Sequence, residues 1–186
     1  MLNLVTDASI EPVTLSEMKT FMKVDLTDEE SLIEALIISA RLSIENYCGI
    51  GLITKTYDYI FDDVADVIKI PLPPLQSVDT FVYNDEDYDE TEISSSYYKV
   101  FSYNKNKGEV ILKPNYEYSD AQVGVRGYRI RFNNGYGDNA SDVPNLLKTA
   151  LKLTVAHWFE NRESQDIPNE AKRLLQQYKV YNIGLG

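Results

Sequence analysis

The stretch 122–132, QVGVRGYRIRF, decides the fold class of the region around it. In an extended strand Tyr128, Ile130 and Phe132 share one face, and the two arginines between them share the other. This alternation is typical of an antiparallel strand with one face on a core and the other in water. The sequence therefore predicts a half-buried strand here.

Other stretches upstream are also rich in β-branched and aromatic residues and are separated by Pro, Gly, Asn and Asp clusters. The predicted strands are Thr54–Phe61, Val67–Ile70, Thr80–Tyr83, Tyr97–Tyr103, Glu109–Leu112 and Gln122–Phe132. Asn106-Lys107-Gly108 and Asn134-Gly135 supply turn residues nearby. The region from about 54 to 133 is predicted to be a mainly antiparallel β region.

On both sides of this region the apolar period changes from 2 to 3.6 residues, which predicts helices near 14–23, 28–48, 143–163 and 169–179. Their apolar stripes predict a structural core formed by Leu32, Leu36, Ile44, Leu147, Leu151 and Trp158. The predicted fold class is α+β: a small bundle of about four helices, with the β-strands inserted between helices two and three. We expect one domain over 1–186, with N-terminal helices in 1–53, the β insertion in 54–138, and C-terminal helices and a tail in 139–186.

The helix ends have recognisable signals. Thr14 and Glu17 form a capping-box pattern at the start of the first helix. Thr27 or Asp28 can cap the second helix, and Gly49 is suited to end it. The last two helices are predicted to open at the prolines 144 and 168.

The composition excludes several classes of protein. The chain has 186 residues and a formal net charge of −11, and its middle part, 57–103, carries −9 of this. Such a surface repels phosphate backbones and anionic lipids, so nonspecific nucleic-acid binding is not expected. Cys48 is the only cysteine, which rules out an internal disulfide. The sequence also predicts no membrane span and no signal peptide.

No catalytic, metal or cofactor residue is predicted. His157 is the only histidine and is interpreted as a packed or hydrogen-bonded core residue, and Cys48 as a small buried hydrophobe. The acidic run Asp85–Glu90 lacks the glycine and the final glutamate of a calcium loop and favours a solvated hairpin tip. Arg126, Arg129 and Arg131 are expected to pair with local carboxylates or a protein partner. A pair of carboxylates for hydrolysis stays open, since no motif nominates one.

Several stretches resemble one known family. They are Glu11–Lys19, Val24-Asp25, Asp28–Glu30, Ile44–Gly49, Leu52–Thr54, Leu72–Val78, Phe132–Gly137 and Val155–Glu163. In this order and spacing the chain resembles tailed-bacteriophage head–tail connector proteins, which are head-completion adaptors. It departs from that pattern at Cys48 and in the acidic, tyrosine-rich stretch 83–103.

The resemblance implies a structural adaptor in the virion, made in the host cytoplasm. Such a protein forms a ring of about a dozen copies below the portal protein, extends the DNA channel and docks the next neck or tail protein. DNA would pass without specific binding. Two alternatives remain: a DNA-packaging accessory protein, which needs a basic face, and a carboxylate-based hydrolase, which needs a cleft.

The end of the chain is the predicted partner-binding segment. Tyr178, Tyr181, Ile183 and Leu185 are anchors of the type that order on binding, and glycines prevent a continuing helix. The alternative is a frayed terminus.

Overall fold

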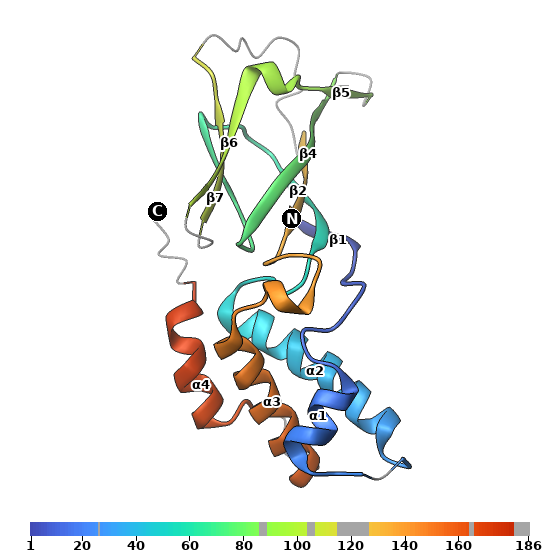
Figure 1. Cartoon of the computed structure of the whole chain (residues 1–186). Coiled ribbons are helices and arrows are strands. Elements are labelled where there is room, and N and C mark those ends of the chain that lie inside the picture. The colour runs from blue at the N-terminus through green and yellow to red at the C-terminus, as the bar shows by residue number, and fades with distance from the viewer. Residues whose placement is uncertain (26, 86–88, 104–106, 115–126, 164–165, 181–186) are drawn as a thin grey trace. The chain divides into compact units, whose positions relative to one another are not determined.

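A computed structural model of the chain describes residues 1–25, 27–85, 89–103, 107–114, 127–163 and 166–180. The chain divides into two compact units. One, the β unit, contains residues 1–8 and 54–136, and the other, the helical unit, contains 9–53 and 137–186 (Figure 1). The predicted α+β class, with helices flanking an antiparallel β region, is confirmed.

The helical unit contains four α-helices and two short 3-10 helices among its described residues. Their bounds are α1 Leu15–Met22, α2 Glu30–Cys48, η2 Ala140–Asp142, α3 Asn145–Glu160, α4 Asn169–Leu175 and η3 Gln176–Tyr178. The predicted capping box is confirmed, because the Glu17 amide donates to Thr14 Oγ1 and the Thr14 amide donates to the Glu17 carboxylate. Gly49 ends α2 in the left-handed region with φ of 70°.

The predicted cap of α2 is wrong. The N-cap residue is Glu29, and its side chain makes no capping hydrogen bond, whereas Thr27 or Asp28 was expected. Glu29 instead pairs with Arg162 at 3.3 Å, beyond the end of α3. This pair is exposed and contributes little to stability, and the start of α2 has no side-chain cap among the described residues.

The core of the helical unit lies on one stripe of α2 and one stripe of α3. Of the predicted core residues Ile44, Leu147, Leu151 and Trp158 are buried, whereas Leu32 and Leu36 are half-buried at the edge. The fully buried stripe of α2 is instead one residue further along, at Ile33, Ile37, Ala40, Ile44 and Cys48. The apolar residues of α2 cover a broad stripe of the helix. The pattern alone therefore could not show whether Leu32 and Leu36 or Ile33 and Ile37 lie at the centre of the buried face.

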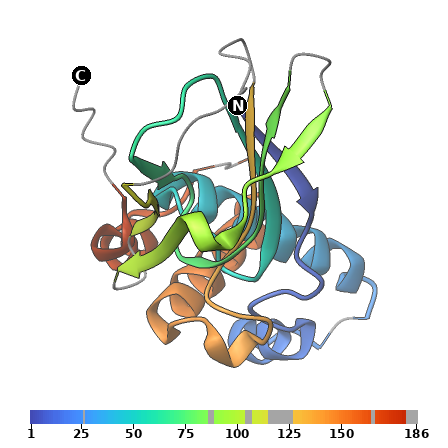
Figure 2. The ribbon, with the colours of Figure 1, turned by 90° about the horizontal axis from the view of Figure 1, so that it is seen from above.

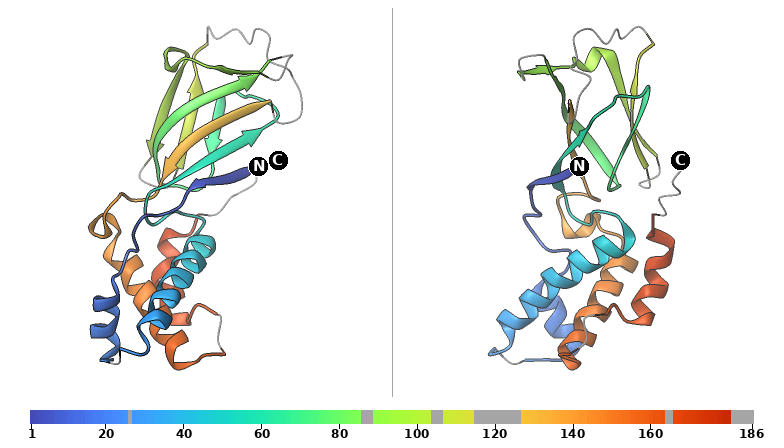
Figure 3. Two further views of the ribbon diagram at one scale, coloured as in Figure 1. Left: turned by 90° about the vertical axis from the view of Figure 1, so that its right-hand side faces the viewer. Right: turned by 180° about the vertical axis from the view of Figure 1, so that it is seen from behind.

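The β unit contains two antiparallel sheets (Figure 3). The five-stranded sheet has the order β1-β2-β8-β4-β5, and the three-stranded sheet has the order β3-β7-β6. The bounds are β1 Leu2–Thr6, β2 Lys55–Phe61, β3 Val67–Ile70, β4 Leu75–Asn84, β5 Glu90–Glu92, η1 Ser95–Tyr97, β6 Tyr98–Tyr103, β7 Lys107–Leu112 and β8 Tyr128–Asn134.

Aromatic and aliphatic side chains from both sheets form the core of this unit. Phe81, Ile130 and Phe132 are fully buried in it, and the alternation predicted for Tyr128–Phe132 is confirmed. Phe61 stacks on Tyr128, with ring centroids 5.6 Å apart. The opposite face of β8 is therefore free to carry the arginines.

Several strand predictions need correction. Strands β1 and β5 were not predicted, and β4 begins at Leu75, well before Thr80. Gly108 lies inside β7 and is not a turn residue, and residues 122–126 and 104–106 lie outside the described part of the chain. Among the described residues, no helix has the length and apolar character needed to cross a membrane.

Candidate functional site

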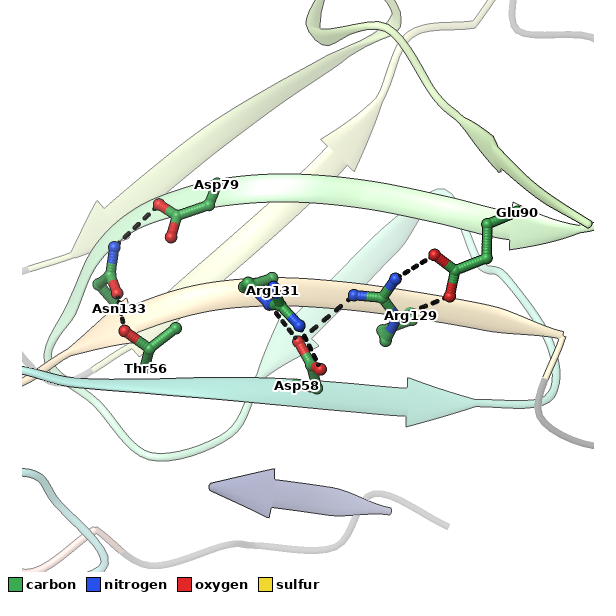
Figure 4. Close-up of polar contacts among 7 residues, drawn as sticks. All are labelled: Thr56, Asp58, Asp79, Glu90, Arg129, Arg131 and Asn133. Atoms are coloured by element: carbon green, nitrogen blue, oxygen red, sulfur yellow. Dashed lines mark hydrogen bonds and ion pairs between the residues drawn. The ribbon is translucent and has the colours of Figure 1, made fainter. Parts of the chain in front are cut away.

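A row of polar side chains crosses the solvent face of the five-stranded sheet (Figure 4). Strand β8 is its centre, because its odd positions alternate with the buried ones and point away from the core. Neighbouring strands supply the partners, so that the row contains Thr56, Asp58, Asp79, Glu90, Arg129, Arg131 and Asn133.

Asp58 on β2 lies between the two arginines of β8. Arg131 donates to it from Nε to Oδ1 at 2.8 Å and from Nη2 to Oδ2 at 2.9 Å. Arg129 Nη1 lies 3.6 Å from Oδ1. The hydrogen bonds from Arg131 hold the pKa of Asp58 below its ordinary value, and the positive charge of Arg129 adds to this in spite of partial burial. Asp58 is therefore an ionised acceptor with both oxygens engaged.

Arg129 also reaches across β4 to the edge strand β5. Its Nε donates to Glu90 Oε1 at 3.2 Å and its Nη2 donates to Oε2. Glu90 lies in the short strand β5, opposite Asn84 in β4. Arg129 therefore connects β8 with β5, two strands that are not neighbours in the sheet. This contact links β5 to the centre of the sheet.

A second, uncharged centre lies further along β8 at Asn133. Its Nδ2 donates to Ser77 Oγ at 2.9 Å and to Asp79 Oδ1 at 2.8 Å. Its Oδ1 accepts from Thr56 Oγ1 at 2.6 Å. Both the donor and the acceptor of this amide are thus occupied by neighbouring strands.

The sequence prediction for the arginines is confirmed for Arg129 and Arg131, which pair with local carboxylates, while Arg126 lies outside the described residues. The occupied carboxylates limit the chemistry of this face. A general acid needs a carboxyl that keeps its proton near neutral pH, and Asp58 is shifted in the opposite direction. The face is a hydrophilic surface on which the described charged groups are paired with one another.

The helical unit contains a buried ionic cluster that sequence reasoning missed. Arg41 is 2% exposed, and its Nε donates to Glu11 at 2.8 Å while Nη1 donates to Glu45 at 3.3 Å. Glu45 also accepts the amide of Leu52 at 2.9 Å. The signal was the only arginine inside the apolar run of α2, four residues before a glutamate. The cluster ties the N-terminal segment and the chain beyond α2 to this helix.

His157 is half-buried on α3, and its ring Nδ1 lies 3.4 Å from Nδ2 of Asn161 at the end of the same helix. This contact is exposed, so the histidine is hydrogen-bonded at the surface instead of within the core. Cys48 is buried, as predicted, and burial raises the pKa of its thiol to about 11 against a smaller opposing effect of Lys179. Neither group has the environment of a nucleophile or a metal ligand. Among the described residues, no group of three His, Cys, Asp or Glu side chains could hold a metal ion.

In the acidic run Asp85–Glu90, residues 86–88 lie outside the described part. Asp85 and Asp89 form a closed turn, since the Asp89 amide donates to Asp85 Oδ1 at 2.9 Å and the Asp85 amide donates to the Asp89 carbonyl at 3.0 Å. Glu90 belongs to β5 and faces Arg129. Of the described carboxylates of the run, Asp85 thus accepts from within the hairpin and Glu90 pairs with β8, whereas Asp89 is exposed.

In the predicted partner-binding tail, Tyr178 is half-buried at the end of η3, and Tyr181, Ile183 and Leu185 lie outside the described residues. The chain before them is held in place. The Val180 amide donates to the Cys48 carbonyl at 2.8 Å, and Lys179 Nζ lies 4.2 Å from the centre of the Tyr47 ring. The described chain therefore ends beside the C-terminus of α2.

An open depression beside α1 contains the carboxyls of Asp25 and Glu30. Glu30 Oε1 lies 2.6 Å from Lys19 Nζ, so this carboxylate is already ion-paired. The depression provides no observation in favour of the hydrolase alternative.

Comparison with protein families gives one family match, to the model described as head completion protein, over residues 11–169. A comparison with curated proteins finds no match.

Solved structures share the fold over the whole chain. A chain in the neck of an empty gene transfer agent (GTA) particle, computed with C6 symmetry, has a TM-score of 0.85 and 19% identity. A chain in the virion of a native GTA particle has a TM-score of 0.85 and 18% identity, and one in the neck of a native particle, computed with C12 symmetry, has 0.75 and 19%. Each match covers 100% of this chain and 98% of the other.

Proposed function

Because the chain belongs to the head completion protein family, we propose that it is a structural head–tail connector of a tailed bacteriophage or prophage. It forms a ring below the portal protein, extends the DNA channel and docks the next neck or tail protein. The family match over 11–169 carries this proposal, and the shared fold with chains of GTA particles supports it. Its place is then the head–tail junction of the virion.

A ring requires one surface of each subunit to meet a different surface of the next. The neck structures with a similar chain were computed with C6 and C12 symmetry, which supports a ring of about twelve copies. The charge is unevenly placed along the chain, with −9 in 57–103 and +3 in 104–186, and contacts between subunits are favoured where surfaces of opposite charge meet.

The electrostatics suit a channel through which DNA slides. Affinity for the phosphate backbone depends on the number of lysines and arginines that neutralise phosphates. The net charge of −11 opposes such contacts, and Arg129 and Arg131 are already paired with Asp58 and Glu90. A wall of this kind lets DNA pass without holding it.

The test is the copy number of the purified chain on its portal. The chain is mixed with portal particles, the complexes are separated by sedimentation, and their mass and image symmetry are measured. The proposal predicts a closed ring of about twelve chains on each portal. Particles that carry no chain, or only dimers of it, would refute the ring.

A further inference from the structure

The outer face of the three-stranded sheet differs from the face of the five-stranded sheet described above. Its side chains are Val67 and Lys69 from β3, Lys107, Glu109 and Ile111 from β7, and Lys99, Phe101 and Tyr103 from β6. We call this set the lysine–aromatic face. The strand register places them in cross-strand rows, such as Lys99 beside Ile111 beside Val67, and Phe101 beside Glu109 beside Lys69.

This face combines apolar surface with unneutralised charge. Phe101 and Tyr103 stack with ring centroids 5.9 Å apart and planes 7° from parallel, and Tyr103 is 45% exposed. The three lysines are exposed, and none forms an ion pair with any residue that the structure describes. With one glutamate among them, the face has a formal charge of +2 on a chain of −11. Exposed apolar and aromatic groups that lie together are typical of a protein contact.

The β4–β5 hairpin has the complementary charge. Residues 85–92 read DEDYDETE, with six acidic side chains and no basic one. Of those described, Asp89 and Glu92 are exposed, whereas Glu90 is used by Arg129. The charged row of the five-stranded sheet is a poorer match for the lysines, because Arg131 and Asn133 already occupy Asp58 and Asp79.

The two surfaces lie on different sides of the β unit. In Figure 1, β6 and β7 lie on one side of this unit and β5 on the other, and the view from above in Figure 2 also keeps them apart. A chain therefore cannot fold its hairpin onto its own lysine–aromatic face. A second copy can place its hairpin there, and the contact leaves the corresponding surfaces free on both outer sides, as a ring requires.

We propose that the lysine–aromatic face of one subunit binds the β4–β5 hairpin of the next, so that the β units form a head-to-tail contact. This inference rests on the proposed ring and adds which surfaces join its subunits. The contact is electrostatic in part, with Lys69, Lys99 and Lys107 facing Asp89 and Glu92. It is therefore expected to weaken with salt, since at 1 M ionic strength charges are screened beyond about 3 Å.

The test is cysteine cross-linking of the full chain. Cys48 is buried and provides an unreactive background. One pool carries Lys99→Cys and the other Glu92→Cys, and a short bismaleimide is added to each pool alone and to a 1:1 mixture at low salt. A head-to-tail contact is expected to give about tenfold more covalent dimer in the mixture than in either pool. Equal yields in all three samples would overturn the proposal.

A charge variant identifies the forces involved. Adding Lys69→Glu and Lys107→Glu to the Lys99→Cys chain is expected to reduce the mixed cross-link to the level of the single pools. Arg162→Glu with Arg173→Glu is the matched control, because both arginines are exposed, lie in the helical unit and give the same change in charge. Circular dichroism checks that each variant is folded. A cross-link that survives the lysine changes would overturn the proposal.

Two further results separate this inference from others. A normal ring on the portal without the cross-link would overturn this contact and leave the proposed function standing. Retention of duplex DNA at low salt by the wild-type chain, lost in Lys69→Glu with Lys107→Glu, would assign the face to nucleic acid and overturn the proposal.

Discussion

Arg131 and Asp58 lie directly opposite each other in β8 and β2 and are joined by two parallel hydrogen bonds. On the other side of the same two strands, Tyr57 stacks on Phe132. A slip of one residue would place the arginine towards the core and the aromatic rings in water. The ion pair and the ring pair therefore specify the same register from opposite faces of the sheet.

Asp58→Asn is expected to destabilise the β unit by about 1–3 kcal/mol at pH 7, because a charge-assisted bidentate pair is lost. The pKa of Asp58 is lowered in the folded chain, so its contribution is complete above the unfolded pKa of about 3.9 and is lost as the pH falls through the folded value. The difference between wild type and variant should therefore shrink below pH 4. Urea unfolding at pH 7 and pH 3 measures this.

Asp63→Asn is the matched control for this change, since Asp63 is exposed in the following loop. It should leave the unfolding midpoint nearly unchanged at both pH values. A constant penalty for Asp58→Asn from pH 7 to pH 3 would mean that the lost interaction is not the ionised pair.

Arg41→Met is expected to cost about 3–5 kcal/mol of unfolding free energy, because Glu11 and Glu45 then lose a buried partner. Arg173→Met on α4 is the control, as Arg173 is 75% exposed and its effect should be within about 0.5 kcal/mol. Thermal melts of both variants decide this. Similar melting temperatures for the two would contradict a structural role for the buried cluster.

Gly108→Ala is expected to destabilise the β unit by about 1–3 kcal/mol, because an added Cβ would lie 2.5 Å from Leu75 Cβ. The strand geometry itself accepts alanine, so the penalty comes from the close approach of the two sheets. Combining it with Leu75→Gly, which removes the Leu75 Cβ as well as the rest of that side chain, should recover part of the loss relative to the sum of the single changes. Strictly additive values in urea unfolding would rule out this contact as the cause.

Deleting residues 181–186 is expected to leave the melting temperature unchanged and to abolish attachment to the portal, if the tail orders on binding. The cut follows Val180, because a cut after Gln177 would also remove its hydrogen bond to Cys48 and the contact of Lys179 with Tyr47. The measurements are a thermal melt and co-sedimentation with portal particles. A truncated chain that melts normally and still binds would leave the tail as a frayed end.

Periodicity predicted the regular elements well and the irregular ones poorly. The alternation of Tyr128–Phe132 is compatible with only one orientation of the strand. The face with the aromatic and aliphatic side chains packs on the core, and the face with the arginines points to water. Strands β1 and β5 lack this contrast, because four of the five residues of β1 and all three of β5 are exposed. Their pairing with β2 and β4 makes them strands, and a local pattern does not show pairing.

The polar row could be predicted only in part. The sequence indicated that the arginines would find carboxylates, but not that Arg131 would pair with Asp58, 73 residues away, and not with the acidic run 85–90, which is closer in sequence. The choice depends on the strand order β2-β8-β4, which brings distant residues to adjacent positions. Arg41 was missed for a similar reason, as Glu11 approaches it from a segment 30 residues upstream.

The β unit is formed by two separate segments of the chain. Strand β1 comes from residues 1–8, and the other strands come from 54–136. Along one edge of the sheet, β1 covers the backbone groups of β2 from Leu2 beside Tyr59 to Thr6 beside Thr56. A fragment that starts at residue 54 would expose this edge next to Tyr57, Tyr59 and Phe61, and an open aromatic edge of this kind recruits other strands. Strand β1 thus protects the edge of β2 from pairing with strands of other chains. It can do so only after α1, α2 and β2 have been synthesised, because all three follow β1 along the chain.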